Sequence, residues 1–248
     1  MPSPLAPLRR LGSTVLDRSR GFFEHRPAAR SLPVALVVVA IVVVALVFGI
    51  YGLGVIFDAT IDETVTVDNP NQPPEWVCET HDEDSPLGDS CDEPDRIHVD
   101  AGSELRDATT GFLHYAPVGG VVLWLIFGVV LHIGARLADG EGSVGDTFVV
   151  AAWALLPEVF RLVAGLAVIH YALAGAEVRD DSMEALATDI IAALETAGEP
   201  LLLASAITIA LQWWIVVGGL EVLHGLSRRK AVAVATIFAV LGGLLALV

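Results

Sequence analysis

Long apolar runs limit what this chain can fold into more than any other feature of its sequence. Five stretches of 18 residues or more carry at most two charged side chains each. About 20 residues of helix cross a hydrocarbon core of ~30 Å, and lipid offers no partners to backbone N–H and C=O groups, so such runs must be helical. The sequence predicts an all-α membrane protein, a bundle of five transmembrane helices spanning 33–57, 115–135, 148–174, 201–223 and 231–248.

Arginine and lysine are unevenly divided between the segments that join these runs. With five spans, the tail 1–32 and the connections after the second and fourth runs lie on one side and carry ten of the fourteen basic residues. The other side carries Arg96, Arg106 and Arg179, while Arg161 lies inside the third run. Since cytoplasmic segments hold the excess of basic residues, we expect the basic N-terminal segment 1–32 to be cytoplasmic and the C-terminus to lie outside. The expected location of the protein is the cell membrane.

Acidic residues dominate the overall charge. Thirty Asp and Glu residues leave a formal net charge of −16, and lysine occurs once. Of the acids, 23 fall in the two segments predicted to be outside, 58–112 and 177–199. An acidic, lysine-poor surface is typical of adaptation to high salt, with self-repulsion at low salt as its cost. This pattern predicts a halophilic source and argues against binding to nucleic acid, which requires a basic surface.

The two outside segments differ in their patterns. Five prolines interrupt the middle of the acidic loop 58–112, which therefore favours short strands around 65–67 and 97–99 or a small disulfide-linked subdomain over a long helix. Residues 181–198 repeat apolar side chains every four positions and present acids on the other face, which predicts an amphipathic helix lying at the outer membrane surface. The alternative is a helix packed on the large loop.

Both cysteines of the chain, Cys78 and Cys91, fall in the acidic loop. An outside loop is exposed to oxidising conditions, so we expect these cysteines to form a disulfide, which stabilises the fold by roughly 3 kcal/mol in the chain-entropy model. Two unpaired thiols are the alternative. The spacing of the cysteines with His81 and His98 does not match a zinc site, so no metal is predicted.

Two charged residues and a proline interrupt the third run. Arg161 lies near its middle, where an arginine costs about 2.5–3.5 kcal/mol on insertion scales. Glu158 is three residues earlier on the same helix face and can pair with it, and Pro157 removes a helix hydrogen bond and introduces a kink. In the fourth run Thr208 and Gln212 share a face and can bond to this pair across the helix interface.

These four residues, Glu158, Arg161, Gln212 and Thr208, form a predicted intramembrane polar site. One interpretation is a pocket for a substrate, an ion or a lipid headgroup, and the other is an ion pair that fixes helix packing. A second predicted cluster lies at the cytoplasmic ends of the second and fourth runs, and its members are His132, Glu221 and His224. The alternative for this cluster is a set of interfacial side chains whose polar ends reach water.

Catalytic motifs are absent from the sequence. It contains no G-x-S-x-G, H-E-x-x-H, Walker or dinucleotide-binding pattern. We therefore expect no catalytic residues, no cofactor and no enzymatic activity.

Several short motifs carry a family resemblance. Residues 137–143 (LADGEGS) lead through 146–148 (DTF) and 152–154 (AWA) to a Leu-Pro pair at 156–157. This resembles the prokaryotic Yip1-domain pattern, in which a Gly-rich cytoplasmic turn precedes a span containing a proline. Residues 18–24 (RSRGFFE) and 223–231 (LHGLSRRKA) are similar to the segments before the first span and at the last turn of that family. The acidic loop departs from the family's usual short connection.

The resemblance implies a five-span domain over 33–248 and, with the composition, a halophilic archaeal member of the family. It implies a non-enzymatic protein that organises the membrane or acts as a scaffold, through lipid contacts and a membrane-protein partner or a second copy of itself. Eukaryotic relatives contact small GTPases through a longer cytosolic N-terminal region. Only 32 residues precede the first span here, so the resemblance does not carry GTPase binding over to this chain. The alternative function is a small-solute or ion transporter or channel that uses Glu158 and Arg161.

Overall fold

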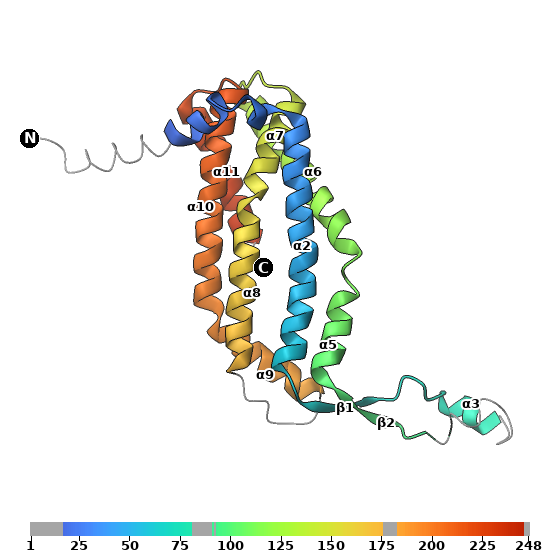
Figure 1. The fold of residues 1–248 in the computed structure, drawn as a ribbon. Coiled ribbons are helices and arrows are strands. Elements are labelled where there is room, and N and C mark those ends of the chain that lie inside the picture. Colours follow the sequence, from blue (N-terminus) through green and yellow to red (C-terminus); the bar gives the residue numbers. More distant parts are fainter. Residues whose placement is uncertain (1–16, 81–90, 92, 176–182, 246–248) are drawn as a thin grey trace, which may run out of the picture. The chain divides into compact units, whose positions relative to one another are not determined.

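A computed structural model describes residues 17–80, 91, 93–175 and 183–245. Figure 1 labels the helices and strands of the chain, which divides into two units. The first contains residues 1–52, 112–168 and 198–248, and the second contains 53–111 and 169–197.

The first unit is helical. After helical residues 17–24 and the short 3₁₀ helix η1 (Pro27–Arg30), four long apolar segments follow. Each has the length and composition to cross a membrane, which confirms the expected multi-pass helical architecture. They are α2 (Leu32–Thr60), whose last turns belong to the second unit, α6 (Tyr115–Leu137), the pair α7 (Val144–Leu155) and α8 (Pro157–Ala174), and α10 (Gly198–Leu223).

The last helix, α11 (Arg228–Leu245), has 18 described residues. It begins three residues before the predicted fifth span, and Arg228, Arg229 and Lys230 occupy its first turn. Those cations leave only 231–245 as the apolar part of the described helix, because residues 246–248 lie outside the described part of the chain. The fifth span, and with it the sidedness of the C-terminus, therefore stays a prediction.

The third apolar run differs in detail from the prediction. It starts at Val144 rather than 148, and its N-cap is Ser143. The Ser143 hydroxyl accepts from the Asp146 backbone N–H while the Asp146 carboxylate accepts from the Ser143 N–H, a capping box. The run then breaks at Leu156, because Pro157 has no N–H to continue the α-helical ladder. The predicted irregularity is a junction between two helices.

Two clusters of buried apolar side chains hold the first unit together. One joins α2, α6 and α7, and the other joins α6, α7, α10 and α11. Glycines allow the closest approaches: a Cβ on Gly219 would lie 2.5 Å from Val150, and one on Gly128 would lie 2.5 Å from Phe148. Small residues at helix contacts are the usual means of close packing inside membranes.

The second unit contains the acidic loop. Strands β1 (Thr64–Asp68) and β2 (Arg96–Asp100) pair antiparallel, with Val65 opposite Val99. Its two strands lie at both expected strand positions. Among the described residues they are the exception to an all-helical fold. Helices α3 (Glu75–Thr80), α5 (Ala101–Thr110) and α9 (Met183–Thr196) complete the unit, and α9 buries Leu186 against Val65. Residues 181 and 182 of the predicted amphipathic helix lie outside the described residues.

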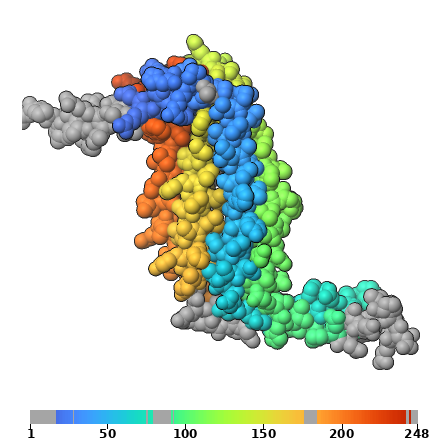
Figure 2. All heavy atoms as spheres, viewed as in Figure 1, coloured from blue at the N-terminus to red at the C-terminus, as the bar shows by residue number. Residues whose placement is uncertain are grey.

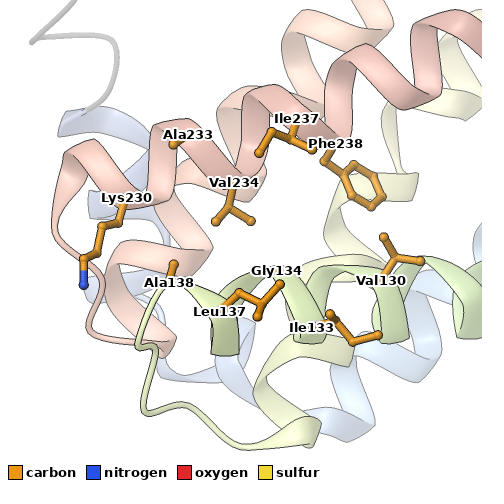
Figure 3. Close-up of a pocket in the computed structure, with 10 residues that line it drawn as sticks. All are labelled: Val130, Ile133, Gly134, Leu137, Ala138, Lys230, Ala233, Val234, Ile237 and Phe238. Carbon is orange, nitrogen blue, oxygen red and sulfur yellow. The ribbon is translucent and has the colours of Figure 1, made fainter.

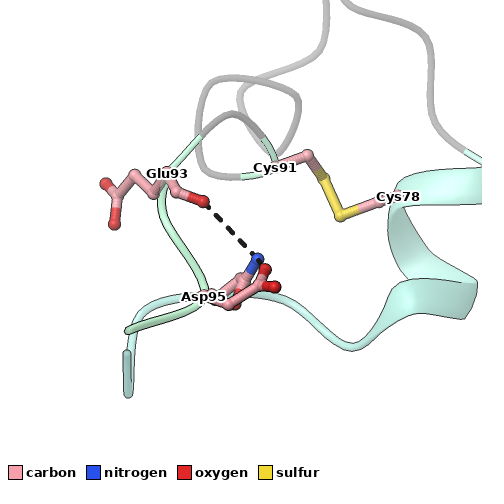
Figure 4. The surroundings of a disulfide bond; sticks show 5 residues. Cys78, Cys91, Glu93 and Asp95 are labelled. Atoms are coloured by element: carbon pink, nitrogen blue, oxygen red, sulfur yellow. Dashed lines mark hydrogen bonds between the residues drawn. A yellow bond between two sulfur atoms is a disulfide. The ribbon is translucent and has the colours of Figure 1, made fainter. Parts of the chain in front are cut away.

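The predicted disulfide is present. Cys78 in α3 is bonded to Cys91, with the two Cα atoms 5.7 Å apart (Figure 4). This bond closes the loop at the far end of the β1–β2 ribbon. His81 lies outside the described residues, and His98 on β2 instead contacts the Thr66 hydroxyl.

Candidate functional site

Glu158 is the centre of the polar group inside the bundle. Its Oε2 accepts a hydrogen bond of 2.6 Å from Arg161 Nε on α8, and its Oε1 accepts one of 2.7 Å from Gln212 Nε2 on α10. Pro157 at the first position of α8 places Glu158 in the first turn, where a carboxylate is favoured by the helix dipole. The Arg161 side chain is 45% exposed and that of Glu158 is 23% exposed.

Thr208 does not join this group. Its side chain is fully buried on α10, and its Oγ1 has no hydrogen-bond partner among the described residues. Gln212 also lines a cavity of about 30 Å³ with aromatic side chains of α6, α10 and α11. A cavity of that size has room for a water molecule or two and no larger solute.

Thr147, a residue outside the predicted set, joins the two histidines of the second predicted cluster. Its hydroxyl lies 2.9 Å from His132 Nδ1 and 3.0 Å from His224 Nε2, and it donates to the Ser143 carbonyl at 3.2 Å. A threonine hydroxyl has one proton and two acceptor positions. A carbonyl can only accept, so a hydroxyl proton directed at Ser143 leaves the two acceptor positions of Thr147 facing the two histidines.

His224 follows the end of α10 and is almost completely buried, with 1% exposure. Its Nδ1 has no hydrogen-bond partner among the described residues and lies close to Gly142. Burial lowers the pKa of His224, while Asp146 acts in the opposite direction and His132 and Arg136 add to the lowering. A neutral ring is the form that this environment favours.

Glu221, the third member of the predicted cluster, lies apart from the histidines. Its carboxylate accepts from Arg228 Nε at 2.8 Å, and Arg228 Nη2 in turn donates to Asp17 Oδ1 at 2.7 Å. Ser19, two residues beyond Asp17, is buried against Gly218 of α10. Figure 2 shows the N-terminal segment lying across this end of the bundle.

Two further hydrogen bonds hold the N-terminal segment 17–30, one within the segment and one from α7. Phe23 is 1% exposed, and Arg30 Nε donates to its carbonyl at 2.7 Å. On the other side, Trp153 Nε1 of α7 donates to the Ala29 carbonyl at 3.0 Å. The basic segment is therefore a packed part of the first unit from residue 17 onward.

The described residues contain no candidate metal site. Within residues 17–80, 91, 93–175 and 183–245, no three His, Cys, Asp or Glu side chains are grouped closely enough to hold a metal ion. The two histidines at Thr147 use their facing nitrogens to bond to its hydroxyl.

Comparison with known proteins places the chain in a family. No curated protein and no solved structure matches it. The family model described as the Yip1 domain matches residues 13–248, which include every helix and strand described above. The match also covers the LADGEGS turn and the Leu-Pro pair that carried the sequence resemblance. The chain belongs to the Yip1 domain family of membrane proteins.

Proposed function

We propose that this protein is a non-enzymatic scaffold of the cell membrane that works through contacts with a membrane-protein partner or a second copy of itself, and with lipid. In this proposal five helices cross the bilayer, the N-terminus is cytoplasmic, and the acidic loop 58–112 faces a salty exterior. The wide apolar surfaces of α2 and α6 are where such contacts would form, since Phe48 and Val118 are 68% and 63% exposed.

The observation that carries this proposal is the use of polar groups inside the bundle. Both carboxylate oxygens of Glu158 are bonded to other side chains of the chain, from Arg161 and Gln212. The cavity beside Gln212 is about 30 Å³, too small for a solute pathway. Interhelical bonds of this kind fix helix packing in membranes, and rigid packing with exposed apolar faces suits a scaffold.

Photo-crosslinking in native membranes tests the proposal. A photoreactive residue is placed singly at Phe48 on α2, Val118 on α6 and Leu203 on α10, all of which are exposed. We expect at least one position to give a protein adduct of constant mass, while the others react with lipid. Mixing two differently tagged versions of the chain identifies an adduct with a second copy.

The same variants, diluted in detergent before irradiation, serve as the control, because a specific adduct at one position should weaken as its partner dissociates. If none of the three positions gives a protein adduct in native membranes, the scaffold proposal is wrong.

One observation favours the alternative, a transporter or channel for a small solute or ion. The Arg161 side chain is 45% exposed although it lies near the middle of the Val144–Ala174 segment. Charged side chains in such positions commonly mark ion or substrate pathways. A transporter using this site should lose its flux in liposomes when Glu158 and Arg161 are both replaced by leucine. Equal flux in the double variant would remove this pair from any transport mechanism.

A further inference from the structure

An apolar groove lies between α6 and α11 in the first unit. Its volume is about 410 Å³, within the range of about 300–1,000 Å³ that is typical of small-molecule sites. Figure 3 shows Lys230 at one end of the groove and Phe238 at the other. Ile133, Leu137 and Ile237 contribute apolar walls and are 54%, 82% and 64% exposed.

The walls suit a hydrocarbon chain. Nine of the ten lining residues are apolar or glycine, and the groove lies along α6, one of the helices with the length and composition to cross a membrane. α6 and α11 approach closely at Gly134, where a Cβ would lie 3.0 Å from Val234. The side chains around this contact therefore line an open apolar groove.

The end of the groove suits an anion. Lys230 is the single ionisable residue among the lining residues and the single lysine of the chain. Its Nζ donates to Asp139 Oδ2 at 2.7 Å, but both side chains of this pair are well exposed, at 47% and 85%. An ammonium group has three donors, so two remain for another acceptor, and an exposed pair of this kind is weak.

We propose that the α6–α11 groove binds an anionic phospholipid, with an acyl chain along the apolar walls and the phosphate on Lys230. In sequence, Arg229 directly precedes Lys230 on α11 and Arg136 directly precedes the lining residue Leu137 on α6. The inference deepens the proposed scaffold function by naming the class of lipid that the protein binds. The binding itself is argued from the groove, and only its biological role rests on the proposed function.

Native mass spectrometry of the purified full chain tests the site. The protein is mixed with equal amounts of phosphatidylglycerol and phosphatidylcholine that have the same acyl chains. We expect one phosphatidylglycerol molecule to be retained per chain in preference to phosphatidylcholine. Since one cation near a membrane surface contributes about 1 kcal/mol, K230Q should reduce this preference about fivefold.

Three further variants separate a site from general charge attraction. R229Q removes an equal charge from the neighbouring position, which does not line the groove, and should change the preference much less than K230Q. D139N frees the Lys230 ammonium and should increase the preference. A233W fills the groove and should reduce the retention of both lipids.

Three results would overturn the inference. The first is equal retention of the two lipids by the unaltered protein, and the second is an equal loss in R229Q and K230Q. The third is a dimer that A233W dissociates, which would make a second copy the occupant of the groove. Because the readout is bound lipid, a failure here leaves the crosslinking test of the scaffold unaffected.

Discussion

Replacing Gly218 with alanine should release the N-terminal segment from the bundle. A Cβ at this position would lie 2.5 Å from the carbonyl carbon of Ser19 and 2.6 Å from its oxygen. These are backbone atoms, so no side-chain rotation relieves the clash, and residues around Ser19 must move away. Overpacking of this kind costs about 1–3 kcal/mol, which corresponds to a roughly 5- to 150-fold increase in the undocked population.

The higher helix propensity of alanine does not cancel this cost. It favours α10 by up to about 1 kcal/mol, but α10 is helical whether or not the N-terminal segment is docked, so the gain is common to both states. Undocking also exposes Phe23, which is 1% exposed when docked, and breaks the ion pair between Asp17 and Arg228.

Limited trypsin digestion measures the change. Arg18 and Arg20 lie in the docked helix, and cleavage there follows the population of the open form when opening is fast relative to cutting. We expect G218A to be cut about 5- to 150-fold faster than the unaltered chain. G119A is the matched control, because a Cβ at Gly119 meets no atom within 4 Å and should leave the rate unchanged. Equal cleavage rates for folded G218A and the unaltered chain would refute the reasoning.

Three further perturbations have clear expected outcomes. R161L alone should destabilise the protein by about 3 kcal/mol, because it leaves the Glu158 charge uncompensated, whereas E158L/R161L should cost less; unfolding in mixed detergent measures both. Because burial lowers the pKa of His224 below its ordinary 6.5, the unfolded chain binds this proton first. Stability from this group should therefore be complete above about pH 6.5 and fall as the pH decreases below it, seen as a lower Tm. C78S/C91S should reduce the stability of the β1–β2 ribbon by about 3 kcal/mol, and hydrogen exchange of residues 64–68 and 96–100 measures the loss.

Each of these predictions has its own contrary result. The ion-pair reasoning is wrong if the double leucine variant is less stable than R161L. For the titration, H224Q keeps a side-chain donor and removes the ionisable ring, so an identical pH dependence in H224Q would assign the effect to other groups. For the disulfide, unchanged exchange in both strands would show that the ribbon is held by α9 and the Val65 cluster instead.

Much of the fold follows from local physics that is visible in the sequence. The apolar runs fix four long segments within a few residues, since burial in lipid requires both their length and their helical state. The apolar run begins at Phe148, so hydropathy alone places the start of the third segment four residues after the observed start at Val144. The Ser143-x-x-Asp146 pattern is a capping-box signal that marks the true start.

The candidate sites were less predictable because they depend on tertiary contacts. Gln212 and Glu158 are 54 residues apart, and helical spacing alone placed Gln212 and Thr208 equally well on the face towards Glu158. Thr147 joins histidines that lie 15 and 77 residues away, so no local spacing marks it. A shared level in the membrane predicts that Glu221 lies with the histidines, but its carboxylate accepts instead from Arg228 in the first turn of α11.

The junction at Leu156 gives the third membrane segment a pivot. On one side α7 is clamped by the apolar core and by the Trp153 bond to Ala29. On the other side α8 is tied to α10 by the Glu158–Gln212 bond. Because the α-helical hydrogen-bond ladder is interrupted between these anchors, a tilt of α8 need not be transmitted to α7. A change in the tilt of α8 would therefore be taken up at the Leu156–Pro157 junction.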